Sequence, residues 1–226
     1  FDTAHGVPIT LKDPDDVSEE VQTHIQNVVQ AAEDALYSEH FANKEVDGAE
    51  NELWWERYID AGSVIDWFIV NELAKNVDAS ASFITSVYLY FNPKDGKLYF
   101  GPNWDFDLGF GNANYTQPGG SSICTDPTGW YVKNVQWISR MFSDSAFVTQ
   151  LKARWNEKSA NIRDAINSTG AFSSMIGVGA QTVAGIQALA DSITEATELN
   201  FVKWPILGHY VWPNADGYEQ RTTYQS

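Results

Sequence analysis

Apolar residues recur at three- and four-residue spacing along the first third of the chain, which is the pattern of helices that bury one face. The first run predicts a helix over residues 16–37, capped by Asp15 or Asp16. The second run predicts a helix over residues 52–76 that is buried on one side and ends near Asn76. The polar stretch between the two runs predicts a loop.

From Phe83 onward the pattern changes to the alternation that is typical of strands. The sequence FITSVYLYF predicts a strand over residues 83–91, and KLYF predicts a second strand over residues 97–100. The Asn-Pro-Lys-Asp-Gly turn between them completes a β-hairpin. Residues 112–129 are rich in Gly, Pro, Ser and Thr and predict a long loop.

The remainder of the chain returns to helical spacing. We expect a short helix around residues 137–142, a longer one capped by Asp144, and further helix within residues 173–200. Together these elements predict a mostly helical α+β fold with one small antiparallel hairpin, in a single domain over residues 1–226. A hydrophobic content of 43% is ample for a core and excludes disorder over most of the chain.

Charge narrows the choice of partner. The formal net charge is −16, and residues 1–110 carry 21 acidic but only 6 basic side chains. This surplus repels phosphate backbones and anionic lipid surfaces, so nucleic acid and membrane surfaces are poor partners. Much of the surplus is expected on solvated helix surface, for example at Glu19, Glu20, Glu33 and Asp34.

Other compositional features exclude further classes of protein. Cys124 is the only cysteine, which excludes an internal disulfide, and the four scattered histidines give no zinc spacing. No apolar run reaches the roughly 18 residues of a membrane span. Because the chain begins at Phe1 with no signal peptide, we expect an excised or processed piece. Low cysteine use suits a bacterial protein, secreted or not, and the acidic, aromatic-rich composition favours one that acts outside the cell.

The densest group of chemically useful side chains follows the predicted hairpin, in the sequence Asn103-Trp104-Asp105-Phe106-Asp107. If this segment is extended, Asp105 and Asp107 point to the same face, because side chains alternate along a strand. Two carboxylates so placed repel each other unless a cation lies between them, and hard oxygen ligands suit Mg²⁺. A capping or Asx-turn role is the alternative for acids in such a pattern.

A third acid, Asp78, lies just beyond the end of the second predicted helix, and one hairpin separates it from Asp105. An acid after a helix, then a hairpin, then a second acid before a glycine is the order of the catalytic and metal loops in protein kinases. This order favours phosphoryl transfer over an isolated capping role.

Three stretches of sequence make the likeness specific. They are NELAKNVD at residues 71–78, SVYLYFNPKDGKLYFGPNWDFDLGFGN at residues 86–112 and LKARWNE at residues 151–157. They resemble the spore-coat CotH family of atypical, secreted or surface protein kinases, in the variety widespread in gut and cellulose-degrading bacteria. The resemblance runs over nearly the whole chain, and its most specific part is residues 66–112.

The resemblance implies a fold like a kinase C-lobe and an enzyme that transfers a phosphoryl group from ATP to Ser or Thr of a protein. It implies that Asp105 binds Mg²⁺, that Asp107 is an auxiliary carboxylate, and that Asp78 orients or deprotonates the substrate hydroxyl. This is chemically coherent, because phosphoryl transfer needs positioning and charge neutralisation more than covalent work.

Four further polar residues are implied to help bind substrate or nucleotide; they are Asn71, Asn76, Ser86 and Asn103. Many members of the family carry Asn in place of Ser86, where it could hold a second metal ion. A serine hydroxyl is a weaker ligand, so the sequence predicts one metal ion more strongly than two.

The chain departs from the kinase pattern because it has no G-x-G-x-x-G loop and no V-A-I-K-type strand. We therefore expect a C-terminal lobe without its nucleotide-gripping partner. An alternative is a catalytically silent module of a multidomain secreted protein, such as one that degrades polysaccharide, whose aromatic loops contact a glycan or partner. Stacking on sugars would use tryptophans that more often pack in cores; the candidates are Trp54, Trp55, Trp104, Trp130, Trp137, Trp204 and Trp212.

Two further enzyme classes use paired acids. A glycosyltransferase would use Asp105 and Asp107 to hold Mn²⁺ and a sugar nucleotide, but no repeated β-α-β pattern precedes the motif. A glycosidase requires a defined separation between two carboxylates, which sequence alone does not give.

Overall fold

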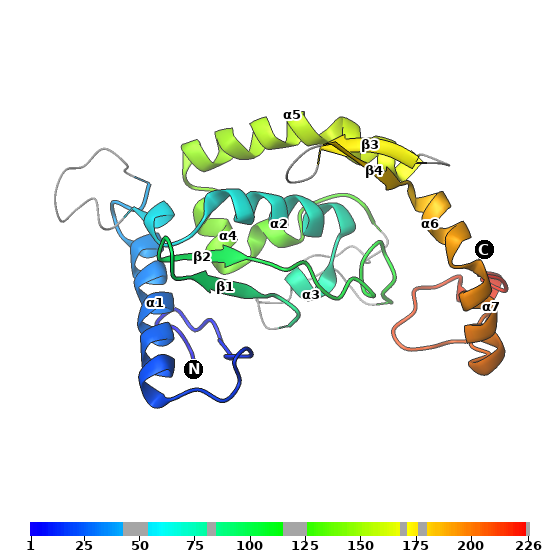
Figure 1. The fold of residues 1–226 in the computed structure, drawn as a ribbon, viewed down its shortest axis with the longest axis horizontal. Coiled ribbons are helices and arrows are strands. Elements are labelled where there is room, and N and C mark those ends of the chain that lie inside the picture. Colours follow the sequence, from blue (N-terminus) through cyan, green and yellow to red (C-terminus); the bar gives the residue numbers. More distant parts are fainter. Residues whose placement is uncertain (43–53, 81–84, 115–125, 168–170, 176–179, 225–226) are drawn as a thin grey trace. The chain divides into compact units, whose positions relative to one another are not determined.

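The computed structural model describes residues 1–42, 54–80, 85–114, 126–167, 171–175 and 180–224 (Figure 1). The chain divides into two compact units, Phe1–Leu151 and Lys152–Ser226. The single domain expected over residues 1–226 stays a prediction. Helices predominate, with small antiparallel strand pairs, which confirms the α+β class.

Helix α1 spans Glu19–Tyr37, so it begins three residues later than predicted. Its N-cap is Ser18, whose hydroxyl accepts a hydrogen bond from the Val21 N–H, and the expected cap at Asp15 or Asp16 is wrong. A serine oxygen at this position satisfies one of the N–H groups that the first turn leaves without a helical partner.

Glu33 on α1 corrects the expectation of a solvated side chain, because it is fully buried. Its carboxylate accepts hydrogen bonds from Thr3 Oγ1 (2.7 Å), Trp137 Nε1 (2.9 Å) and the His5 N–H (3.0 Å). Burial by itself raises the pKa of Glu33, but these bonds outweigh burial and hold the pKa below its ordinary value. One carboxylate thus joins the N-terminal segment, α1 and a tryptophan more than a hundred residues away.

The region predicted as one helix over residues 52–76 consists of a short 3₁₀-helix, η2 at Trp55–Arg57, and helix α2 at Ala61–Ala74. The chain leaves helical geometry between them because residues 58–60 pair with Leu98 through two backbone hydrogen bonds. Asp60 then caps α2 by accepting from the Ser63 N–H at 2.7 Å.

Helix α2 is buried around most of its circumference, so the prediction of one buried side is wrong. Most of its predicted apolar stripe is covered, but Leu73 at the end of the stripe is 40% exposed, whereas the polar residues Asn71 and Glu72 are buried. The polar pair indicates that this end of the helix packs against polar structure rather than against water.

The predicted hairpin is confirmed, with shorter strands. Strand β1 spans Leu89–Asn92 and β2 spans Lys97–Phe100, paired antiparallel. The first predicted strand began at Phe83, which lies outside the described residues. Phe100 connects the hairpin to α2, because its N–H donates to Ser63 Oγ and its ring meets Trp67 edge-on at 5.2 Å.

Beyond the predicted loop, the first unit is completed by the 3₁₀-helix η3 at Val132–Asn134, α4 at Gln136–Met141 and the start of α5 at Ser145–Asn167. The cap at Asp144 is confirmed, since its Oδ1 accepts from the Ala146 N–H at 2.8 Å. The largest fully buried apolar side chains of this unit include Trp55, Trp137, Phe147, Leu36, Ile59, Ile138 and Met141.

The second unit corrects the helix predicted within residues 173–200. Strands β3 at Ala171–Met175 and β4 at Ala180–Ala184 pair antiparallel, and helices α6 at Ile186–Ser192 and α7 at Thr194–Lys203 follow. Threonine and valine in residues 171–184 favour extended backbone, and serine lowers helix propensity. The prediction from apolar spacing did not take these propensities into account. A short 3₁₀-helix, η4, spans Tyr218–Gln220.

Within the described parts of the chain, no helix combines the length and apolar character needed to cross a bilayer.

We predict that Glu33→Gln lowers the free energy of unfolding at pH 7 by about 2 kcal/mol or more, because several buried donors lose a charged acceptor. Since the pKa of Glu33 is lowered in the folded state, its stabilisation is lost as the pH falls through that pKa, and the difference from wild type shrinks in acid. Urea denaturation at several pH values measures both effects.

The matched control is Glu39→Gln, which changes an exposed glutamate just after the same helix. Equal stability of the two variants at pH 7 would show that the buried carboxylate does not hold these segments together.

Candidate metal centre

Asp78 is placed by an abrupt change of direction after α2. The helix ends at Lys75, which adopts left-handed backbone geometry with φ 50°, and the four-residue helix α3 at Val77–Ser80 follows at once. Asn76 lies between the two helices, and its Oδ1 accepts a hydrogen bond from the Asp78 N–H at 3.2 Å. Asp78 is therefore in the first turn of α3, with its side chain half-buried.

Asp105 and Asp107 lie on the loop that follows β2. This loop is fixed to the end of α2, because the Phe110 N–H donates to the Ala74 carbonyl. The approach is close at Gly109, where an added Cβ atom would lie 3.0 Å from the Phe106 carbonyl oxygen of the same loop and 3.4 Å from the Ala74 carbonyl oxygen of α2. The glycine predicted to follow the acids thus leaves room for this close packing.

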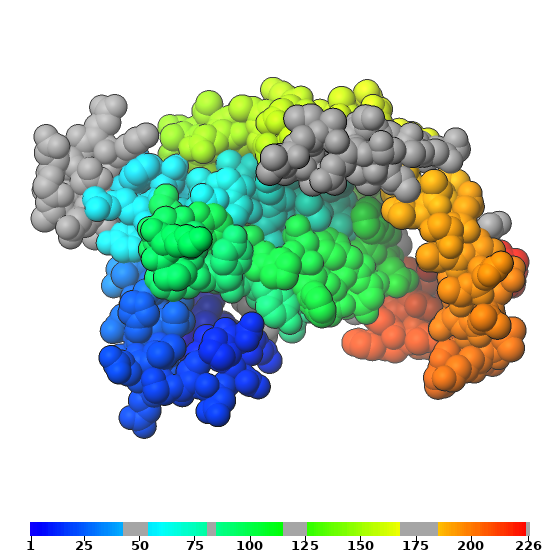
Figure 2. Space-filling model, in the orientation of Figure 1, coloured from blue at the N-terminus to red at the C-terminus, as the bar shows by residue number. Residues whose placement is uncertain are grey.

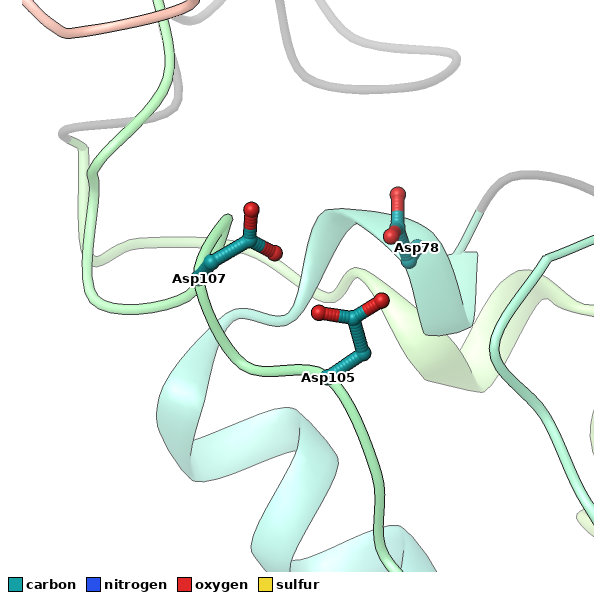
Figure 3. A group of neighbouring side chains, drawn as sticks. All are labelled: Asp78, Asp105 and Asp107. Carbon is teal, nitrogen blue, oxygen red and sulfur yellow. The ribbon is translucent and has the colours of Figure 1, made fainter.

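The three carboxylates converge on one region between the loop and α3 (Figure 3). Asp78, Asp105 and Asp107 each offer one oxygen, and these oxygens all lie within 4.8 Å of one another. The predicted closeness of Asp105 and Asp107 therefore holds, but its expected cause does not. The segment is a turn rather than a strand, and Asp105 has φ 60°.

The site opens to solvent. Asp105 and Asp107 are exposed, and the space-filling view shows the hairpin and the following loop, in green, on the visible surface (Figure 2). A site built this way is accessible to a nucleotide or a protein side chain without any rearrangement of the core.

Like charges dominate the electrostatics of the cluster. Burial raises the pKa of Asp78, and the charges of Asp105 and Asp107 raise it further, against a smaller lowering by a hydrogen bond with Ser86. Among the ion pairs formed within the described residues, none includes any of the three aspartates. Within the part of the chain that the structure describes, the three carboxylates thus lie close together with no basic side chain paired to them.

Backbone strain gathers at the same place. The described residues include four non-glycine residues with positive φ, and these are Lys75, Ser86, Asp105 and Phe110. Each lies on a segment that carries an acid or contacts one. Left-handed backbone is unfavourable for such residues and persists where surrounding contacts fix it, often at functional sites.

The four polar residues predicted beside the acids all belong to this region. Asn71 and Asn76 are only 2% and 1% exposed and hydrogen-bond to each other, with Asn76 Nδ2 donating to Asn71 Oδ1 at 3.0 Å. Asn103 Oδ1 accepts from Asn71 Nδ2, also at 3.0 Å. Ser86 Oγ donates to Asp105 Oδ2 at 3.1 Å. Their predicted contacts with substrate or nucleotide stay predictions.

Comparison with family models matches residues 5–173 to the one described as CotH kinase protein. The chain belongs to the CotH family. The match includes all three aspartates and the four polar residues around them. The bacterial variety and the C-terminal lobe stay predictions. No curated protein and no solved structure matched the chain.

Sequence reasoning missed one residue of this CotH-family site, Glu72 on α2. Its carboxylate accepts hydrogen bonds from the N–H groups of Tyr131, Val132 and Lys133, at 2.8 to 3.3 Å. It also forms an ion pair with Lys75 (2.9 Å). The only signal in the sequence was the Glu–Lys spacing of three residues, which is common on solvated helices.

Two aromatic side chains on the loop that carries Asp105 and Asp107 are exposed in this CotH-family chain. Trp104 is 57% exposed and Phe110 73%. Burial, the commoner fate of tryptophan, is found instead for Trp55 and Trp137. The exposed rings provide flat apolar surface beside the carboxylates.

We predict that Asp107→Asn raises the free energy of unfolding by a few tenths to about 1 kcal/mol in metal-free buffer at pH 7. The reason is that burial first, and then the charges of Asp105 and Asp107, raise the pKa of Asp78. The part due to Asp107 is a repulsion that opposes folding above that raised pKa and is absent below the ordinary pKa of aspartate. The gain should therefore disappear near pH 3, below the ordinary pKa of aspartate, where Asp78 with its raised pKa is protonated.

Asp15→Asn is the control for a general effect of removing one negative charge, because Asp15 is exposed and lies outside the cluster. Denaturation curves in the presence of a chelator give both values. An equal gain in the two variants would contradict a specific repulsion among the three acids.

Proposed function

We propose that this CotH-family domain is a bacterial protein kinase that acts at or outside the cell surface and transfers a phosphoryl group from Mg·ATP to Ser or Thr of a protein. The observation that carries the proposal is the convergence of Asp78, Asp105 and Asp107 within a chain that matches the CotH kinase family. The helix, hairpin and turn that bring them together follow the order of kinase catalytic and metal loops.

The donor set fits a magnesium ion. Carboxylate oxygens are hard ligands, Mg²⁺ is usually held by one or two protein carboxylates, and no basic side chain of the described residues pairs with these acids. Asp105 and Asp107, which lie on the exposed loop, would hold the ion. When bound, Mg²⁺ supplies the positive charge that neutralises the phosphates during transfer.

Asp78 is the residue suited to the substrate hydroxyl. It lies on a different segment from Asp105 and Asp107, at the start of α3, and burial together with their charges raises its pKa. A carboxylate with a raised pKa is a better proton acceptor at neutral pH. We assign to Asp78 the orientation of the Ser or Thr hydroxyl and the acceptance of its proton at a carboxylate oxygen.

Ser86 has a supporting role in this proposal. Its hydroxyl donates to Asp105 Oδ2, which leaves Oδ1 of the same carboxylate for an incoming ligand. A hydroxyl used in this way orients a ligand carboxylate, as second-shell groups commonly do in metal sites.

We predict that Asp105→Asn lowers phosphate transfer from Mg·ATP by about 100-fold or more, because a neutral amide is a poor ligand for Mg²⁺ and the transfer depends on charge neutralisation. The measurement is incorporation of label from γ-labelled ATP into serine or threonine of the protein itself and of an added protein substrate. It is made on the whole protein that carries this chain.

Asp15→Asn removes the same charge from an exposed position away from the cluster and should leave transfer unchanged. Unchanged transfer in Asp105→Asn would show that this acid does not hold the metal. Absence of transfer in the wild type with every protein substrate tested would oppose the kinase assignment.

The second candidate is a catalytically silent binding module. Exposed tryptophans favour it, since Trp204 and Trp212 in the second unit are 56% and 71% exposed, in addition to Trp104 beside the acids. Calorimetry separates the two functions, because the kinase binds Mg·ATP whereas a silent module of this kind gives heat only with oligosaccharides or a partner domain.

A further inference from the structure

We propose that Asn76 is a positioning residue that holds the backbones of Asp78 and Asp105 at the separation a metal ion requires. The inference rests on the proposed function, since it concerns the same metal centre. In this inference Asn76 acts by positioning the two aspartates, and it does not itself contact a nucleotide or substrate.

The side chain of Asn76 touches the backbone of both segments that carry the acids. Its Oδ1 accepts from the Asp78 N–H at 3.2 Å, and its Nδ2 donates to the Asp105 carbonyl oxygen at 3.4 Å. The side chain is 1% exposed and lies in the short turn between α2 and α3. A shift of this amide would therefore change the position of Asp78 relative to Asp105.

A second amide fixes the first. Asn76 Nδ2 also donates to Asn71 Oδ1, and Asn71 Nδ2 donates to the Trp67 carbonyl (2.9 Å) and to Asn103 Oδ1. These hydrogen-bonded amide side chains thus connect the body of α2 to the loop after β2 at two residues, Asn103 and Asp105. Because α2 is part of the core, its position is fixed, and the hydrogen bonds fix Asn103 and Asp105 relative to it.

The orientation of both amides follows from the backbone groups that they meet. The Asp78 N–H can only donate, so it must face Asn76 Oδ1, and the Trp67 carbonyl can only accept, so it must face Asn71 Nδ2. The remaining donor and acceptor then meet each other. Neither an aspartate nor a leucine could make this set of bonds at position 76.

A neutral side chain is also what the electrostatics require. The three carboxylates repel one another, and a buried basic residue between them would compete with a metal ion for the same charge. An amide links the two backbones with no net charge, so it holds the acids together and leaves them unneutralised for a cation. Groups that support metal ligands in this way typically change metal affinity 10- to 100-fold when they are removed.

The test separates positioning from simple helix capping by means of two variants. Asn76→Ser retains a short side-chain oxygen that can cap α3, but it is too short to reach the Asp105 carbonyl, whereas Asn76→Ala loses both bonds. Asn156→Ser is the control, because Asn156 is exposed on α5 and the substitution is chemically the same. The probe is Mn²⁺, titrated without nucleotide and followed by the electron paramagnetic resonance signal of the free ion.

We expect Asn76→Ser and Asn76→Ala both to bind Mn²⁺ about 10-fold or more weakly than the wild type, and Asn156→Ser to bind it equally well. If Asn76 only caps α3, Asn76→Ser binds Mn²⁺ like the wild type and the inference is overturned. Circular dichroism melting of each variant shows that the protein remains folded at the temperature of the titration.

A second readout does not depend on metal. Hydrogen exchange of the peptide that contains residues 103–112 should be faster in Asn76→Ser than in the wild type, because the loop loses its bond to Asn76. If the wild type binds no Mn²⁺, the proposed metal centre fails, and the exchange rates alone then decide the positioning role. Equal exchange in the two proteins would contradict it.

Discussion

The arrangement depends on keeping three like charges close together, with no basic side chain among the described residues paired to them. Asp78, Asp105 and Asp107 lie within 4.8 Å of one another, and the raised pKa of Asp78 records burial together with the charges of the other two. Such a cluster opposes folding unless other contacts fix the segments that carry it. A cation bound as proposed would offset this cost, and the surrounding contacts hold the segments that carry the acids in place.

The surrounding contacts all converge on the C-terminal end of α2. The Ala74 carbonyl accepts from the loop at Phe110, the amides of Asn71 and Asn76 reach Asn103 and Asp105, and Glu72 anchors the segment at residues 131–133. These contacts explain why residues that a helical wheel assigns to solvent are buried here. They also explain how positive φ values at Lys75 and Asp105 persist, because each is enclosed by bonds to its neighbours.

The sequence predicted much of this arrangement through local rules and family resemblance. Spacing located the hairpin, α4 and the Asp144 cap, and the order of acids located all three members of the cluster. It failed where distant contacts override local pattern. The break before α2 comes from pairing with Leu98, and the burial of Glu33 and Glu72 comes largely from donors 28 to 104 residues away. Helical spacing carries no information about such partners, and it missed strands β3 and β4 where serine, threonine and valine favoured extended backbone.

The central claim is that these carboxylates form a metal centre. Crystals of the protein soaked in Mn²⁺ test it most directly, through the anomalous scattering of the ion. The account predicts one anomalous peak about 2.0–2.3 Å from carboxylate oxygens of Asp105 and Asp107, with Asp78 beside it. An electron density map with no peak at this position under saturating Mn²⁺, or with a basic side chain lying among the three carboxylates, would contradict it.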